Sequence, residues 1–239
     1  MEGHKDRVIR TEGLFKVYDD GAVSLKAVND VSLSIEKGEF TALVGPSGSG
    51  KTTLLNLIGG LDTPTAGKVW VHEKNISGLK KNQLIDFRLY NIGFVFQAYN
   101  LVPVLTAREN IEFVMLLQKV GKEERNRRVD QLLGEIGLQD KAGKRPAELS
   151  GGQQQRVAVA RALASKPQFV LADEPTANLD SKTAENLLDM MAKLNMDEGM
   201  TFLFSTHDQR VIDRAKRVIT LVDGSIVSDV TREKTTIEA

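Results

Sequence analysis

The amino-acid sequence predicts an α/β fold built around a parallel β-sheet. Apolar runs of strand type occur at 40–45, 93–97, 169–172 and 201–206, and stretches with helical spacing of apolar residues lie between them. Strands that alternate with helices in this way are typical of parallel sheets, because each crossover needs room for a helix. A chain of 239 residues, 41% of them hydrophobic, is also large enough to bury such a core.

The N-terminal part of the chain is expected to be rich in β-strand. Residues 14–18 (LFKVY) have strand character, and residues 31–35 (VSLSI) alternate apolar and polar side chains. The same alternation recurs at 68–73 (KVWVHE). A period of two is typical of strands that bury one face, so we expect β-structure in both places.

The loop at 45–53 (GPSGSGKTT) has the G-x-x-x-x-G-K-S/T spacing of a phosphate-binding P-loop. Its glycines let backbone N–H groups converge on phosphates, Lys51 reaches the β and γ oxygens, and the Thr52 hydroxyl is placed to hold Mg²⁺. A strand-type run precedes the loop, and a helical run over 52–61 follows it and ends in glycines. We therefore predict a P-loop NTPase core of the RecA-like type, with nucleotide contacts from Gly45, Pro46, Ser47, Gly48, Ser49, Gly50, Lys51, Thr52 and Thr53.

The middle of the chain is expected to be mostly helical. The apolar spacing is helical between about 79 and 92 and again over 106–165. One stripe follows the i, i+3, i+4, i+7 pattern of a helix face: Val129, Leu132, Leu133 and Ile136. At the other end, the polar residues 230–239 are predicted to form an exposed tail.

Two acids follow the apolar run at 169–172. Asp173, at the end of this predicted strand, can hold Mg²⁺ through water, opposite Thr52. Glu174 can orient a water in line with a γ-phosphate. Taken alone, the same pair of acids would also be typical of an acidic helix N-cap.

Two further polar residues follow strand-type runs. Gln97 closes the run at 93–97, and its amide can bind a water and Mg²⁺ together because it both donates and accepts. His207 follows the run at 201–206, and near a γ-phosphate its imidazole could contact the phosphate and the attacking water. In isolation, each would more often be a surface amide or a structural histidine.

A second anion-binding helix start is predicted at 149–164 (LSGGQQQRVAVARALA). Ser150 is a plausible N-cap, and Gly151 and Gly152 leave the backbone open to close approach. A chain with one P-loop and this second helix start must either bring both to one nucleotide within the fold or present the second helix start to a ligand elsewhere.

The composition excludes several classes of function. Lys+Arg and Asp+Glu both number 32, so the chain lacks the basic surplus of a general nucleic-acid binder. It has no cysteine, which removes disulfides and thiol chemistry. No run approaches eighteen apolar residues, and the N-terminus lacks an apolar export signal. We expect any membrane association to depend on another polypeptide.

Together these segments resemble the ATP-binding-cassette (ABC) ATPase family over nearly the whole chain. LSGGQ at 149–153 is similar to the signature of that family, GPSGSGKTT to its Walker A, FVLADE to its Walker B and NLD at 178–180 to its D-loop. Gln97 and His207 stand where the family has its Q-loop and switch residues. The resemblance implies catalytic roles for Glu174, His207 and Gln97, Mg²⁺ ligation by Thr52, Gln97 and Asp173, and further ATP contacts from Tyr18, Ser150, Gly151, Gly152, Gln153 and Asp180.

The family also implies an architecture, a single ABC ATPase domain over 1–239. The expected subregions are an antiparallel β subdomain (8–40 plus 66–76), a nucleotide-binding core (40–65, 93–97 and 166–225) and a helical subdomain (98–165). It implies a head-to-tail homodimer in which each ATP lies between the P-loop of one copy and the Ser150 turn of the other. One P-loop and one signature per chain fit that arrangement.

The segments 59–67, 93–111 and 171–187 resemble a narrower group, the lipoprotein-release and macrolide-efflux type. This resemblance implies an ATPase subunit at the cytoplasmic face of the cell membrane that moves integral membrane permease subunits. The wider ABC family implies that Tyr18 stacks on adenine. No nucleic-acid partner is expected. The sequence leaves open an alternative, in which the ATPase is a regulatory switch acting on an envelope or cell-division partner without transport.

Overall fold

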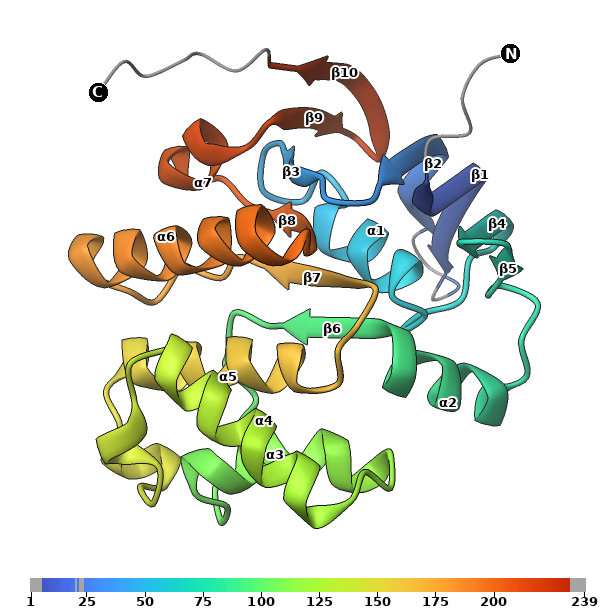
Figure 1. The fold of residues 1–239 in the computed structure, drawn as a ribbon. Helices are drawn as coiled ribbons and strands as arrows, with labels where there is room; N and C mark the ends of the chain where they lie inside the picture. The colour runs from blue at the N-terminus through green and yellow to red at the C-terminus, as the bar shows by residue number, and fades with distance from the viewer. Residues whose placement is uncertain (1–5, 20, 22–23, 233–239) are drawn as a thin grey trace.

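The computed structural model describes residues 6–19, 21 and 24–232. Within these ranges the strands form two sheets, of which the first is antiparallel and has the order β2-β1-β4-β5 (Figure 1). Its strands are β1 (Arg7–Asp19), β2 (Ser24–Glu36), β4 (Ala66–Val71) and β5 (Lys74–Asn75).

The second sheet has the order β10-β9-β3-β8-β7-β6, and it confirms the predicted parallel core. Neighbours from β9 through β6 pair in parallel. Its strands are β3 (Phe40–Val44), β6 (Ile92–Val95), β7 (Phe169–Asp173), β8 (Thr201–Ser205), β9 (Arg217–Val222) and β10 (Ser225–Thr231).

Strand β10 was not expected from the sequence, and it pairs antiparallel with β9. The two strands are joined by Asp223 and Gly224, which have φ angles of 46° and 77°. Two positive φ angles in a two-residue loop are typical of a type I′ hairpin, for which Asp-Gly is a favoured sequence. Residues 230 and 231 of the predicted tail therefore belong to β10, and 233–239 lie outside the described residues.

Helices cover both faces of the parallel sheet (Figure 1). Successive residues of β8 show the alternation, because Phe202 and Phe204 pack with the helical side of the core while Leu203 packs toward α1 and the antiparallel sheet. The α-helices are α1 (Lys51–Ile58), α2 (Lys81–Asn91), α3 (Ala107–Leu117), α4 (Lys122–Glu135), α5 (Gly151–Ala164), α6 (Ser181–Glu198) and α7 (Gln209–Arg214). Short 3-10 turns, η1 (Gln139–Lys141) and η2 (Pro146–Glu148), join α4 to α5. Among the described helices, none combines the length and apolarity needed to cross a membrane.

The start of α5 confirms Ser150 as an N-cap. The Ser150 hydroxyl accepts a hydrogen bond from the Gln153 N–H at 3.3 Å, and the Gln153 side chain accepts one from the Ser150 N–H at 2.9 Å. This reciprocal pair is a capping box, which satisfies two backbone donors at the helix end. Asp180 caps α6 in a similar way, and hydrogen bonds from the side chain and N–H of Thr183 lower the pKa of its carboxyl.

Candidate functional site

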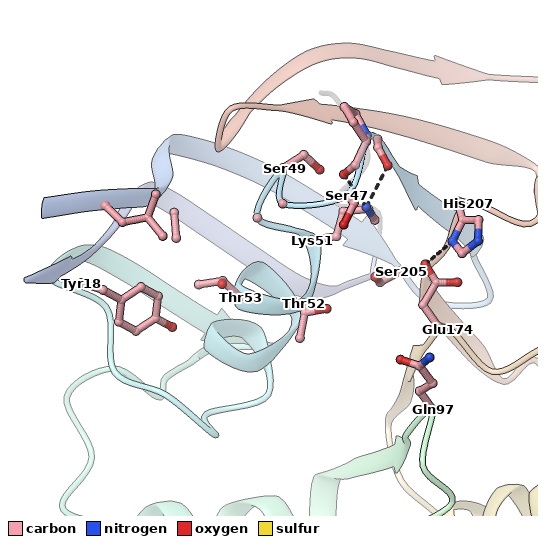
Figure 2. A pocket seen from close by; sticks show the side chains of 16 residues that line it. Tyr18, Ser47, Ser49, Lys51, Thr52, Thr53, Gln97, Glu174, Ser205 and His207 are labelled. Carbon is pink, nitrogen blue, oxygen red and sulfur yellow. Dashed lines mark hydrogen bonds and ion pairs between the residues drawn. The ribbon is translucent and has the colours of Figure 1, made fainter. Parts of the chain in front are cut away.

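The P-loop, Glu174 and His207 meet in a pocket of about 640 Å³. It lies at the carboxyl ends of β3, β7 and β8, the edge at which open α/β sheets hold their ligands (Figure 2). The residues that line it are Tyr18, Leu25, Ala27, Gly45, Pro46, Ser47, Gly48, Ser49, Gly50, Lys51, Thr52, Thr53, Gln97, Glu174, Ser205 and His207.

Two glycines of the P-loop are required by geometry. A Cβ built on Gly45 would lie 2.0 Å from the Leu221 carbonyl oxygen, and one on Gly50 would lie 2.1 Å from the Ala27 carbonyl oxygen. Gly50 also has a φ of 98°, a backbone conformation that L side chains rarely adopt. The loop therefore follows the neighbouring strands closely, and its N–H groups are left to face the pocket.

Replacing Gly50 with alanine should destabilise the nucleotide-free protein by about 3 kcal/mol or more, because the new Cβ meets a backbone carbonyl as well as a strained φ. Gly48→Ala is the matched control, since Gly48 has a φ of 80° but nothing within 4 Å of its Cβ position, so only about 1 kcal/mol should be lost. Urea unfolding of the two variants measures the difference. Equal losses would mean that the contact with Ala27 has no energetic weight.

Lys51 is folded back onto its own loop. Its ammonium donates to the carbonyl oxygens of Gly45 at 2.8 Å and Pro46 at 2.9 Å. These are hydrogen bonds to neutral acceptors, whereas a bond to a phosphate oxygen has charge on both partners and is roughly twice as strong. The side chain is thus held at the site in a position from which an anion can draw it.

Thr52 lines the pocket, and Asp173, which is not among the lining residues, contacts Thr52. The Thr52 hydroxyl donates to an oxygen of Asp173 at 3.1 Å, which joins the start of α1 to the end of β7. Gln97 reaches the same pocket from the loop after β6. The sequence placed Gln97 at the end of the strand, but β6 ends at Val95, so Gln97 lies in the loop that follows. Among the described residues there is no cluster of three or more His, Asp or Glu side chains that could hold a metal.

Glu174 is fixed by its backbone and by His207. Its φ is 46°, and its N–H donates to the Ser205 carbonyl oxygen at 2.8 Å. One carboxylate oxygen lies 2.8 Å from Nδ1 of His207, as the dashed line in Figure 2 shows, and the other accepts a long bond of 3.4 Å from the Thr206 hydroxyl. A non-glycine residue in the left-handed region is strained, and such strain is often found at functional sites.

Comparison with known proteins identifies the family. The ABC transporter model matches residues 28–177. The chain belongs to the ABC transporter family. It is 44% identical over 222 residues to the macrolide export ATP-binding/permease protein MacB of Hyphomonas neptunium, which covers 93% of this chain and 34% of MacB. It is 41% identical over 221 residues to the lipoprotein-releasing system ATP-binding protein LolD of Legionella pneumophila, which covers 92% of this chain and 97% of LolD.

A solved structure of an ABC cassette has the same fold. The dimeric, post-hydrolysis state of MJ0796 of Methanocaldococcus jannaschii, bound to ADP and Pi, matches with a TM-score of 0.88 at 41% identity and covers 95% of this chain and 99% of that one. These findings confirm the predicted ABC ATPase fold, the ATPase class and the resemblance to the lipoprotein-release and macrolide-efflux type.

Tyr18 lines the P-loop pocket of this ABC protein at the end away from Glu174 (Figure 2), and it is 42% exposed. Its hydroxyl donates to Asp62 at 2.8 Å, Lys16 lies 4.8 Å from the ring centre, and burial together with Asp62 raises its pKa. Leu25 pairs with it across the strands of the antiparallel sheet. The sequence did not predict Leu25 and Ala27 as pocket residues. The alternation of apolar and polar residues in β2 could not indicate them, because they reach the pocket only through the pairing of β2 with β1.

The ABC signature turn lies apart from this pocket. Ser150, Gly151, Gly152, Gln153 and Asp180 are not among its lining residues. The family resemblance implies that the Ser150 turn contacts the ATP of a second copy, which this single chain does not test. Ser150 and Asp180 are exposed. A Cβ built on Gly151 would lie 2.8 Å from the Tyr99 hydroxyl, so the turn meets the loop that follows Gln97.

That loop is held from two sides. Asn178, in the D-loop segment, donates to the Gln97 carbonyl oxygen at 3.0 Å. Arg161, on α5, donates to the carbonyl oxygens of Tyr99 at 3.0 Å and of Asn100. Tyr99 and Asn100 both have positive φ angles, 56° and 50°, so the arginine stabilises a turn that the backbone alone disfavours. Burial lowers the pKa of the Arg161 guanidinium.

Proposed function

We propose that this chain is the ATP-hydrolysing subunit of an ABC transporter, which couples Mg-ATP binding and hydrolysis to movement of membrane permease subunits. The observation that carries the proposal is the separation of the two elements that the sequence predicts to bind phosphate. The P-loop shares a pocket with Glu174 and His207, whereas the exposed Ser150 turn lies outside it. Each turn is then available to the nucleotide of a second copy.

Mg²⁺ fits the oxygen donors at the pocket edge. The Thr52 hydroxyl and a carboxylate oxygen of Asp173 are 3.1 Å apart, and Gln97 can add an amide oxygen from its loop. Hydroxyl, carboxylate and amide oxygens suit this hard cation, which keeps several waters and takes few protein ligands. When bound, the ion would neutralise charge on the β and γ oxygens.

Glu174 is proposed to orient the attacking water and accept its proton. Its carboxylate is kept at the pocket by His207 and Thr206, and its strained backbone leaves it little freedom. His207, exposed in the single chain, would contact the γ-phosphate. Lys51 would leave the carbonyls of Gly45 and Pro46 for the phosphates.

Two copies are proposed to close head to tail around two ATP molecules. Each γ-phosphate could then accept charge-assisted bonds from both copies, which favours the closed state as long as ATP is intact. Loss of phosphate removes the shared anion and reopens the pair. The MJ0796 cassette, which shares this fold, is described as a dimer in its ADP and Pi state.

The membrane partner is proposed to dock on the loop 98–107. Val104 is 71% exposed there, and the loop is kept in shape by Arg161 and by the buried Asn110, whose amide bonds the backbone of Val102 at 2.8 and 3.2 Å. A groove of about 350 Å³ lies near the loop and includes Asn100 and Arg161. Docking would hold the chain at the cytoplasmic face of the membrane. The names of LolD and MacB, a releasing system and an export permease, agree with this proposal.

The test is reconstitution with the membrane protein that co-purifies with the chain. After that protein is identified and placed in liposomes, it should raise ATP turnover by the chain. Val104→Asp should remove the stimulation, because a buried carboxylate at the contact is unfavourable, whereas Val227→Asp, at a valine 61% exposed on β10, should keep it. Unchanged turnover with the membrane protein would contradict coupling, and coupled turnover that moves no cargo would favour the regulatory switch.

A further inference from the structure

Ser205 is a buried hydroxyl at the site that the activity described above does not use. It is the last residue of β8, has 0% relative exposure and lines the P-loop pocket. Its Oγ has no hydrogen-bond partner among the described residues. Nearly all buried polar groups in folded proteins are paired, so an unpaired one at a functional site needs an explanation.

The position of Ser205 in the sheet points to the bound phosphate. β8 lies between β3, which leads into the P-loop, and β7, which ends at Asp173. In the strand register, Ser205 is opposite Leu43 on one side and Asp173 on the other. Its side chain therefore starts from the middle of the site, beside Glu174 in Figure 2.

The backbone around Ser205 is held on both sides, which limits where the hydroxyl can turn. The Ser205 carbonyl oxygen accepts from the Glu174 N–H at 2.8 Å, and the next N–H, of Thr206, donates to the Leu43 carbonyl oxygen at 3.0 Å. Because these groups are satisfied within the sheet, the hydroxyl cannot find a partner by a shift of its own strand. The pocket that Ser205 lines is the place from which a ligand can supply the missing partner.

We propose that Ser205 is a phosphate-binding residue whose hydroxyl donates to an oxygen of the terminal phosphate of bound ATP. This inference rests on the proposed function, since it takes ATP as the ligand. The hydroxyl is covered in the nucleotide-free chain, so its contact with the phosphate requires a local rearrangement of the pocket. In the proposed function, Lys51 leaves the carbonyls of Gly45 and Pro46 for the phosphates, and this movement is the rearrangement that we invoke.

An unpaired buried hydroxyl destabilises the nucleotide-free fold but strengthens nucleotide binding. Its removal should therefore raise or preserve the melting temperature while it lowers the affinity. Ser205→Ala removes an unpaired buried hydroxyl, so the melting temperature of the nucleotide-free chain should stay the same or rise by roughly 2–4 °C. Affinity for a non-hydrolysable ATP analogue with Mg²⁺ should fall about tenfold, as expected for a lost bond to a charged acceptor, while ADP affinity changes less than about twofold.

Ser165→Ala is the matched control. Ser165 is also a buried serine, but it lies at the end of α5 and its hydroxyl is paired with the Ala162 carbonyl oxygen at 3.5 Å. This variant should leave the ratio of the two affinities unchanged. Calorimetric titration of the full chain with each nucleotide gives both values.

Several results would overturn the assignment. A lower melting temperature for Ser205→Ala would mean that the hydroxyl is paired within the fold. Equal weakening of ADP and the analogue would place the contact elsewhere, and a slower turnover with an unchanged ratio would assign the hydroxyl to the water. If the unmodified chain hydrolyses ATP while Ser205→Ala has the same ratio of analogue affinity to ADP affinity as the unmodified chain, only the Ser205 proposal fails. If the unmodified chain binds no Mg-ATP, the proposed function fails.

Discussion

Glu174→Gln should lower ATP hydrolysis by about 10²–10⁴-fold while ATP binding stays intact. Glutamine has the shape of glutamate and its amide oxygen can still accept from His207, which lies 2.8 Å from the carboxylate, but it cannot take a proton from water. The φ of 46° strains glutamate and glutamine to the same degree, so the substitution should not change the local fold. Phosphate release and titration with ATP measure the two effects.

The same variant should trap the closed dimer. Since ATP is bound but not consumed, the shared phosphates should persist, and gel filtration with Mg-ATP should show the double mass. Glu135→Gln is a suitable control, because Glu135 is an exposed residue of α4 bonded to Gln131, far in sequence from the site. Turnover close to that of the unmodified chain would remove Glu174 from the proposed role.

Mixing a Lys51→Ala chain with a Ser150→Arg chain should restore activity that neither has alone. In a head-to-tail pair, the intact P-loop of the second chain faces the intact signature turn of the first, so each mixed dimer has one complete site. With equal amounts and random pairing, half of the dimers are mixed, and turnover should reach at most roughly a quarter of the unmodified value if the sites act independently.

The control for this experiment replaces the Ser150→Arg partner with a chain that carries both substitutions. Mixed dimers of Lys51→Ala with that double variant have no complete site, so they should remain inactive. Activity in this control would point to residual function of Lys51→Ala. If the first mixture shows no activity above either parent, the nucleotide is bound by one chain alone.

The sequence predicts the parts of the site that lie close together along the chain. The P-loop spacing around Lys51 and the apolar run that ends at Asp173 are local patterns, and the sheet brings them together because parallel strands end at one edge. The cap at Ser150 is also local, and its capping box is present. Such features depend on a few adjacent residues, so they can be read without the tertiary structure.

Other features depend on pairing between distant segments. Ser205 looks like an ordinary strand residue until β8 is placed between β3 and β7. Leu25 reaches the pocket only because β2 pairs with β1 beside Tyr18. β10 is a different case, since Asp223-Gly224 is a favoured hairpin sequence but the apolar residues of 225–231 (SIVSDVT) do not alternate regularly enough to indicate a strand.

The clamp made by Arg161 has a consequence for how force passes through the molecule. It joins the loop beside Val104 to the helix that begins at the signature turn, while no comparable clamp joins that helix to the P-loop among the hydrogen bonds of the described residues. A push on the loop from outside would thus be transmitted to α5. In the proposed head-to-tail dimer, the N-terminal end of α5 faces the ATP bound by the other copy, so the proposed membrane contact of each subunit would act mainly on the nucleotide of its partner.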